Sequence, residues 1–121
     1  MSKIKISGVE LEFNPLDADE VETYEAAIER VQKRTQEIKV DKSMKLSEGI
    51  RAICHEIFDC FNTVFGEGTD RKLFGNKTDM GACLSAFGEL VQQTKAVGHE
   101  QMQEIYSKYL PNREFRRGAK K

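Results

Sequence analysis

The sequence predicts a mainly α-helical fold in which an N-terminal β-hairpin is followed by a bundle of about four helices. Three observations predict this class. Apolar and polar residues alternate over the first 13 positions, which is typical of a half-buried hairpin. From residue 17 onwards apolar residues recur at steps of three and four, the spacing of one helix face. Polar or glycine-rich segments at 40–44 and 66–78 separate these helical stretches.

Residues 3–13 are predicted to form the hairpin. A two-residue turn, Ser7-Gly8, lies between two segments in which every second residue is apolar, and this is a strong local hairpin signal. The apolar residues are Ile4, Ile6, Val9, Leu11 and Phe13. Because a lone hairpin is only marginally stable, its apolar face must pack on helices or pair with another chain.

The first helix is predicted to begin near Asp17. Asp17 and Glu20 have the spacing of a capping box, which marks a helix start. The apolar stripe of this helix is narrow and suits packing against one neighbouring helix. It consists of Val21, Tyr24, Ile28, Val31, Thr35 and Ile38.

A central helix is predicted from Leu46 to Phe65, after the polar break at 40–44. Its apolar face is wide, and burial of each large side chain contributes roughly 1.5–3 kcal/mol, so we expect it to organise the fold. Gly66 is predicted to stop this helix in the left-handed conformation. The apolar face contains Leu46, Ile50, Ile53, Cys54, Ile57, Phe58, Phe61, Val64 and Phe65.

The glycine-rich segment 66–78 is predicted to be a loop anchored by Leu73 and Phe74. Thr78 or Asp79 can cap a third helix, and Gly98 is predicted to kink that helix or to separate it from a fourth. Apolar residues of the third helix are Met80, Cys83, Leu84, Phe87, Leu90 and Val91, and those of the fourth are Met102, Ile105, Tyr106, Tyr109 and Leu110.

One domain is expected over residues 1–111, because 121 residues can bury a single core. Pro111 is predicted to end the last helix. Residues 112–121 are interpreted as a basic flexible tail. Its charged residues are Arg113, Glu114, Arg116, Arg117, Lys120 and Lys121.

The overall charge favours neither nucleic acid nor an anionic membrane as a partner, since 19 basic residues balance 20 acidic ones. The three cysteines are odd in number and lack CxxC spacing, which fits neither a disulfide framework nor a zinc site. No segment has the pattern of a signal peptide or a membrane span. We therefore expect a cytoplasmic protein without cofactor or metal.

Two enzyme-like motifs fit their chemistry poorly. Segment 75–78 resembles the end of a phosphate-binding loop, but Asn76 separates the glycine from the lysine and no apolar strand precedes it. Cys54 and His55 are the residue types of a thiol nucleophile and its base. Adjacent positions on a helix diverge by about 100°, so these two side chains cannot act together. The sequence therefore predicts a non-enzymatic protein with no catalytic residues.

An acidic segment spans residues 10–29, with eight Asp or Glu residues and no Lys or Arg. One interpretation is a solvated surface with a favourable helix dipole at the start of the first helix. The other is head-to-tail association, or docking of a basic partner at this end of the molecule. Both interpretations remain open at the level of sequence.

The residues at 5–19, 64–69, 73–79 and 84–91 resemble a family of small proteins from phages and prophages of Gram-positive bacteria. They contain the hairpin followed by Asn-Pro-Leu-Asp, the Phe-Gly pairs at 65–66 and 74–75, and a Leu-Ser-Ala-Phe-Gly-Glu-Leu-Val segment. The resemblance covers residues 4 to about 110. These proteins look like the tail assembly chaperones of long-tailed siphophages.

The resemblance implies a non-enzymatic protein in the bacterial cytoplasm that binds the tape measure protein and keeps it soluble while the tail tube assembles. The tail tube protein is a further possible partner, and the chaperone is expected to form homo-oligomers. A tape measure helix is expected to bind in a groove between the central helix and the third or fourth helix. Alternatively, the apolar stripe of the first helix joins chaperone copies to each other. The candidate partner-binding residues are Tyr24, Ile28, Val31, Phe61, Phe74, Phe87, Tyr106 and Tyr109.

Two other classes of function remain. The acidic segment is compatible with a phage-encoded binding module that modulates a host defence protein. An enzyme with an unrecognised site would instead need a concave pocket with convergent polar groups.

Overall fold

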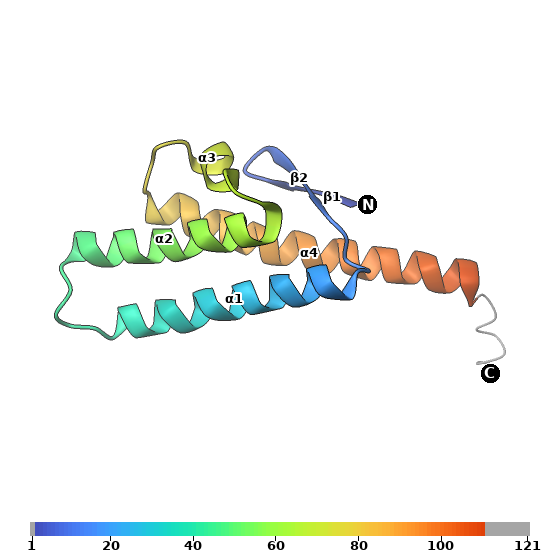
Figure 1. Ribbon diagram of the computed structural model, residues 1–121, viewed down its shortest axis with the longest axis horizontal. Coiled ribbons are helices and arrows are strands. Elements are labelled where there is room, and N and C mark those ends of the chain that lie inside the picture. The colour runs from blue at the N-terminus through green and yellow to red at the C-terminus, as the bar shows by residue number, and fades with distance from the viewer. Residues whose placement is uncertain (1, 111–121) are drawn as a thin grey trace.

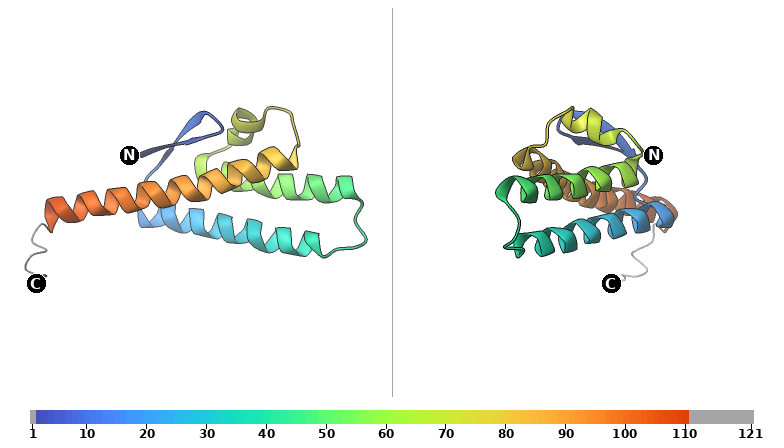
Figure 2. Two further views of the ribbon diagram at one scale, coloured as in Figure 1. Left: turned by 180° about the vertical axis from the view of Figure 1, so that it is seen from behind. Right: turned by 60° about the vertical axis from the view of Figure 1, so that its left-hand side comes forward.

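The computed structural model describes residues 2–110, which form a two-stranded antiparallel sheet and four helices (Figure 1). The predicted fold class is therefore confirmed. Helices α1 and α2 run antiparallel side by side and α4 crosses beside α2, while the hairpin and α3 lie on the side that faces away from α1 (Figures 1 and 2). The elements are β1 (Ser2–Ile6), β2 (Val9–Phe13), α1 (Ala18–Lys39), α2 (Leu46–Phe65), α3 (Thr69–Phe74) and α4 (Met80–Tyr109).

The hairpin forms as predicted. Ile4 lies opposite Leu11 in its register. The turn residues Ser7 and Gly8 both have positive φ, 50° and 81°, as the two central residues of a type I′ turn require. The apolar face is buried against α4 and α2. The backbone N–H of Ser7 donates to Oε1 of Glu89 at 2.9 Å, which fixes the turn on α4.

Helix α1 starts where the sequence predicts, but only half of the capping box forms. The Asp17 carboxylate accepts a hydrogen bond from the backbone N–H of Glu20 at 3.0 Å. The Glu20 carboxylate accepts from the N–H of Asn14 at 3.0 Å instead of returning to Asp17. Glu20 thus fixes the backbone of Asn14, in the segment that leads into α1.

Helix α1 packs mainly on α2, as its narrow stripe predicts. Glu56 of α2 accepts hydrogen bonds from Arg30 at 3.2 Å and from Arg34 at 3.4 Å, and so links the two helices. The Glu56 side chain is only 12% exposed, whereas both arginines are substantially exposed. The ion pairs therefore lie at the edge of the helix contact, where solvent screens them in part.

Helix α2 is central, because it contacts α1, α3, α4 and β2. Phe61 on α2 is fully buried, with ring centroids 6.2 Å from Phe65 and 5.9 Å from Phe74. The stop at Gly66 differs from the prediction. Its φ of 108° and ψ of 157° lie outside the left-handed helical region, in a conformation that glycine adopts at low cost.

The segment 66–78 contains the short helix α3, so the prediction of a loop was wrong there. The Thr69 hydroxyl donates to the carbonyl of Gly66 at 2.7 Å, and the N–H of Asp70 donates to Oδ1 of Asn62 at 3.0 Å. These contacts give hydrogen-bond partners to polar groups at the start of α3, including the backbone N–H of Asp70, which has no partner within the helix. Leu73 and Phe74 pack on the core as the predicted anchor.

The predicted third and fourth helices are one continuous helix, α4, so the predicted kink or break at Gly98 was wrong. Asp79 caps α4, since its carboxylate accepts from the N–H of Gly81 at 2.9 Å. A Cβ placed on Gly98 would lie 3.8 Å from Cβ of Pro15, where the chain crosses α4. A helical glycine costs only about 1 kcal/mol, which packing overcomes. Pro111 and the tail at 112–121 lie outside the described residues.

Candidate functional site

A groove lies between α1 and α4, because α1 packs mainly on α2, α4 packs on both α2 and β1, and the two helices make few contacts with each other. Its volume is about 230 Å³. It is lined by Val31, Gln32, Thr35, Gln36 and Lys39 from α1 and by Leu84 and Phe87 from α4. Val31 is buried at its base, Phe87 is half-buried, and Leu84 is 42% exposed. The groove thus presents an apolar surface to solvent.

Thr35 also lines this groove, but its hydroxyl is not presented to solvent. Its Oγ1 atom is buried and has no hydrogen-bond partner among the described residues. A buried hydroxyl without a partner costs roughly 1–3 kcal/mol. Gln32, Gln36 and Lys39 of α1 supply exposed polar groups along the groove, beside the apolar Leu84 and Phe87 of α4. The groove therefore suits an amphipathic segment better than a purely hydrocarbon one.

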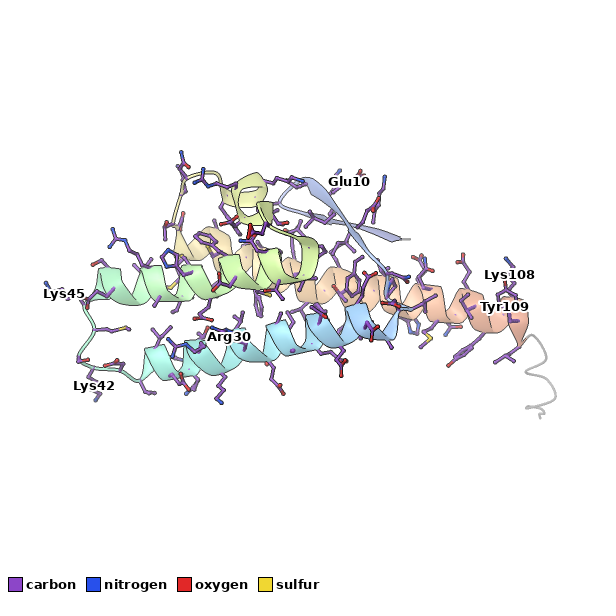
Figure 3. The ribbon with its side chains drawn as sticks, in the orientation of Figure 1. Glu10, Arg30, Lys42, Lys45, Lys108 and Tyr109 are labelled. Atoms are coloured by element: carbon purple, nitrogen blue, oxygen red, sulfur yellow. The ribbon has the colours of Figure 1, made fainter. Side chains whose placement is uncertain are left out.

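A second and larger groove, of about 640 Å³, lies between α1 and α2. The ion pair of Arg30 with Glu56 borders it, and Arg30 is labelled in Figure 3. Asp59 and Glu67 also line it, and neither forms an ion pair within residues 2–110. The charged residues of the groove are accordingly acidic in balance, with Glu56, Asp59 and Glu67 against Arg30, which suits a basic segment.

The C-terminal part of α4 projects beyond the other elements (Figures 1 and 2). Past the contact of Gly98 with Pro15, large apolar side chains remain exposed on this part of the helix. Lys108 lies over the ring of Tyr109, 5.4 Å from its centroid, at the far end of α4 in Figure 3. The exposed apolar residues are Met102 (44%), Tyr106 (48%), Tyr109 (63%) and Leu110 (57%).

Six of the eight predicted partner-binding residues belong wholly or partly to the core. Phe61 is fully buried, so its side chain is inaccessible to a partner in this fold. Val31 is also buried and reaches a partner only at the base of the α1–α4 groove. Tyr24 packs on Phe13 with ring centroids 5.6 Å apart, and burial raises the pKa of its hydroxyl. Three further predicted residues, Ile28, Phe74 and Phe87, are partly buried against the core.

The Tyr24 hydroxyl lies near Thr94 of α4, and this proximity offsets part of the rise in its pKa. No hydrogen bond of regular geometry forms between the two, so we count the buried Thr94 Oγ1 as unpaired among the described residues.

The predicted aromatic residues that reach the surface lie in two separate places. Phe87 lines the α1–α4 groove, while Tyr106 and Tyr109 lie on the projecting end of α4. The structure therefore does not bring the eight residues into one site. Sequence reasoning missed Leu84 and Met102 as surface residues, because both have the helical spacing of core positions.

The enzyme-like motifs are separated by the fold. Cys54 is buried and His55 is exposed, so they face different environments. Burial raises the pKa of the Cys60 thiol to about 12, and it also raises the pKa of Cys83. Both thiols are thus protonated at neutral pH and poor nucleophiles. No cluster of three or more His, Cys, Asp or Glu suited to a metal ion occurs in residues 2–110.

The segment 75–78 follows α3 and not a strand. The first turn of α4, where a phosphate would bind in a phosphate-binding loop, is capped by the Asp79 carboxylate. An anion is thus already present at that helix terminus. Within the described part of the chain, no helix combines the length and hydropathy needed to cross a membrane.

A family profile described as "Family of unknown function (DUF6673)" matches residues 7–120. The match includes the second hairpin strand and all four helices, and therefore both grooves and the projecting end of α4. Searches among curated proteins and among solved structures found no significant match.

Proposed function

We propose that this chain, which belongs to the DUF6673 family of unknown function, is a non-enzymatic phage tail assembly chaperone. In this proposal it binds amphipathic helical segments of the tape measure protein and keeps that protein soluble while the tail tube assembles. The phage assignment comes from the sequence resemblance. The observation that carries the binding mode is the open groove between α1 and α4, in which apolar Leu84 and Phe87 face the exposed polar side chains of Gln32, Gln36 and Lys39.

The size of the groove suits side chains of a bound helix better than a small molecule. At about 230 Å³ it is smaller than the ~300–1,000 Å³ of typical small-molecule pockets. Helix-in-groove recognition needs only apolar anchors at one face of the bound helix. Leu84 and Phe87 offer such anchors a partly exposed apolar wall, and Lys39 at the rim can pair with an acidic residue on the polar face of the bound helix.

The strength of a single site is expected to be modest. Burial of one large apolar side chain contributes roughly 1.5–3 kcal/mol, whereas micromolar affinity needs about 8 kcal/mol after the cost of association. A long helical partner with many apolar stripes would engage many copies at once, and the linked sites would bind far more tightly than each one alone. Weak single sites also allow the chaperone to leave when the tube protein displaces it.

The test is co-purification of the tape measure protein from the same genome with three forms of the chain. Leu84→Glu places a charge in the groove at a site that is already 42% exposed, so the fold should survive. Leu46→Glu is the matched control, since Leu46 is 82% exposed on α2 and does not line the groove. We expect wild type and Leu46→Glu to retain the tape measure protein and Leu84→Glu to lose it. Equal retention by all three forms would exclude the groove as the binding surface.

A second candidate function is the acidic binding module that modulates a host defence protein. Glu22, Glu25 and Glu29 are exposed along α1, and the salt bridges found within residues 2–110 do not include them. Asp59 and Glu67 extend the acidic surface into the α1–α2 groove. Conversion of the three α1 glutamates to glutamine should abolish binding to a host protein under this alternative, and it should leave capture of the tape measure protein unchanged under the chaperone proposal.

A further inference from the structure

The thiols of Cys54 and Cys83 lie side by side in the core, where α2 packs on α4. Each helix presents a row of fully buried residues at steps of three and four, and the two helices run in the same direction (Figure 1). The first residue of one row therefore lies beside the first residue of the other. The row of α2 consists of Cys54, Ile57 and Phe61, and that of α4 consists of Cys83, Ala86 and Leu90.

The acidity of Cys83 depends on this contact. Burial raises the pKa of its thiol, a hydrogen bond with the Cys54 side chain and the charge of Cys54 raise it further, and the charge of Asp79 adds to the rise. A disulfide needs two Cα atoms within roughly 7 Å of each other, a separation that thiols in contact across two packed helices allow. The two cysteines are therefore placed to be joined without a change of fold.

The third cysteine faces another part of the molecule. Cys60 is six positions after Cys54 on α2, which turns its side chain by about 120° around the helix. It lines the groove between α1 and α2, whereas Cys54 contacts Cys83 of α4. Cys60 is thus a matched control, since it is a buried cysteine on a different face of the same helix.

We propose that Cys54 and Cys83 form a redox-sensitive pair, which hydrogen peroxide converts into an intramolecular disulfide that joins α2 to α4. Peroxide oxidises the first thiol to a sulfenic acid and is itself reduced to water. The second thiol then attacks that sulfur, the S–S bond forms, and the sulfenic hydroxyl leaves with the thiol proton as a second water molecule. Two thiols and one peroxide molecule thus give one disulfide and two water molecules.

Cys83 is the thiol that peroxide reaches first. It lies in the first turn of α4, beside the exposed Gly81 and Ala82, and the Asp79 carboxylate caps this turn. Cys54 lies in the middle of α2 instead. Helix ends open at a lower free energy than helix centres, and burial keeps the Cys83 thiol protonated while the turn is closed. The rate of oxidation is therefore set by the opening of this turn.

The disulfide would stabilise the fold and fix one wall of the α1–α4 groove. It closes a loop of about 30 residues, from 54 to 83, which restricts the unfolded chain and should raise Tm by roughly 10 °C. Leu84, the neighbour of Cys83, lines that groove, so the bond holds this part of α4 against α2. The inference goes beyond the proposed function and does not depend on it, since it concerns only the contact of α2 with α4.

The test is oxidation of the full chain by hydrogen peroxide in native buffer, followed by alkylation of the remaining thiols and mass spectrometry. We expect one internal disulfide, with a mass lower by about 2 Da before alkylation, and one alkylated thiol at Cys60. Trypsin should release peptides 52–71 and 78–95 joined to each other. In urea the bond should instead join Cys54 to Cys60, because the shortest loop closes most readily in an unfolded chain.

Two variants locate the bond. Cys60→Ala should form the disulfide at the wild-type rate to within about twofold and show the same rise in Tm, whereas Cys83→Ala should form no internal disulfide in native buffer. Circular dichroism reports whether each variant is folded. If Cys83→Ala does not fold, the peptide map of the wild-type chain decides which two cysteines are joined.

Three thiols that remain free in native buffer, or that are oxidised to sulfinic acid without a disulfide, would overturn the inference. A native disulfide that includes Cys60, or one that joins two chains, would overturn it too, because Cys54 and Cys83 would then not be the neighbouring pair. A disulfide between Cys54 and Cys83 that lowers Tm would contradict the claim that the fold already holds the two thiols in place.

Discussion

Replacement of Gly98 by alanine tests whether α4 is a single helix that packs on the chain entering α1. In a helix interior alanine is favoured over glycine by about 1 kcal/mol. The new Cβ would meet Cβ of Pro15 at 3.8 Å, an ordinary van der Waals distance, so no steric cost is expected. Partial burial of the added methyl group contributes up to ~0.8 kcal/mol more. We therefore expect Gly98→Ala to raise the free energy of unfolding by about 1–1.5 kcal/mol.

Urea denaturation followed by circular dichroism measures this change. With an m value of about 2 kcal/mol/M, the midpoint should rise by about 0.5–0.75 M, and Tm should rise by roughly 4 °C or more. All forms are compared at one low protein concentration, so that association does not contribute.

Gly88→Ala is the matched control, because a Cβ at this helical position meets no atom within 4 Å. It should gain only the helix-propensity part of the stabilisation, about 1 kcal/mol. A destabilised Gly98→Ala beside a stabilised Gly88→Ala would show that α4 breaks at residue 98 or packs there more tightly than 3.8 Å, and would refute the reasoning.

Three further substitutions or conditions probe the core. Phe61→Ala should lower the free energy of unfolding by roughly 3–5 kcal/mol in urea titrations, since its ring is fully buried, and a loss below 1 kcal/mol would contradict that burial. Thr94→Val should raise stability by about 1 kcal/mol because it removes the unpaired buried hydroxyl, and a loss would indicate a real bond to Tyr24. The pKa of Cys60 is raised to about 12 in the folded chain, above the usual thiol value of about 8.5, so its contribution to stability is complete below pH 8.5 and is lost as pH rises towards 12. The urea midpoint should fall between pH 8 and pH 10.5, and this fall should be smaller in Cys60→Ala than in wild type. An equal fall in both proteins would show that the Cys60 thiol does not cause the loss of stability.

The first half of the fold was predictable because its signals are local. The type I′ turn at Ser7-Gly8, the cap at Asp17 and the wide apolar face of α2 each depend on residues close together in sequence. The continuity of α4 through Gly98 was not, because the contact that favours it joins residues 83 positions apart. Helix α3 likewise depends on the side chain of Asn62.

The candidate site was predictable only by residue type. Phe61 and Phe87 occupy equivalent positions on apolar helix faces, yet one is in the centre of the core and the other lines a groove. The difference comes from how α1 and α4 are placed around α2, which no local pattern encodes. Tyr106 and Tyr109, which were chosen as candidate partner-binding residues, are exposed on the projecting end of α4, where the sequence predicted a fourth helix.

The most direct test of the chaperone proposal is the native mass of the material isolated after co-expression of this chain with the tape measure protein of the same genome. The account predicts a soluble complex of one tape measure chain with many copies of this chain, while the tape measure protein expressed alone is insoluble. A tape measure protein that stays in the pellet, with this chain recovered only by itself, would contradict the account.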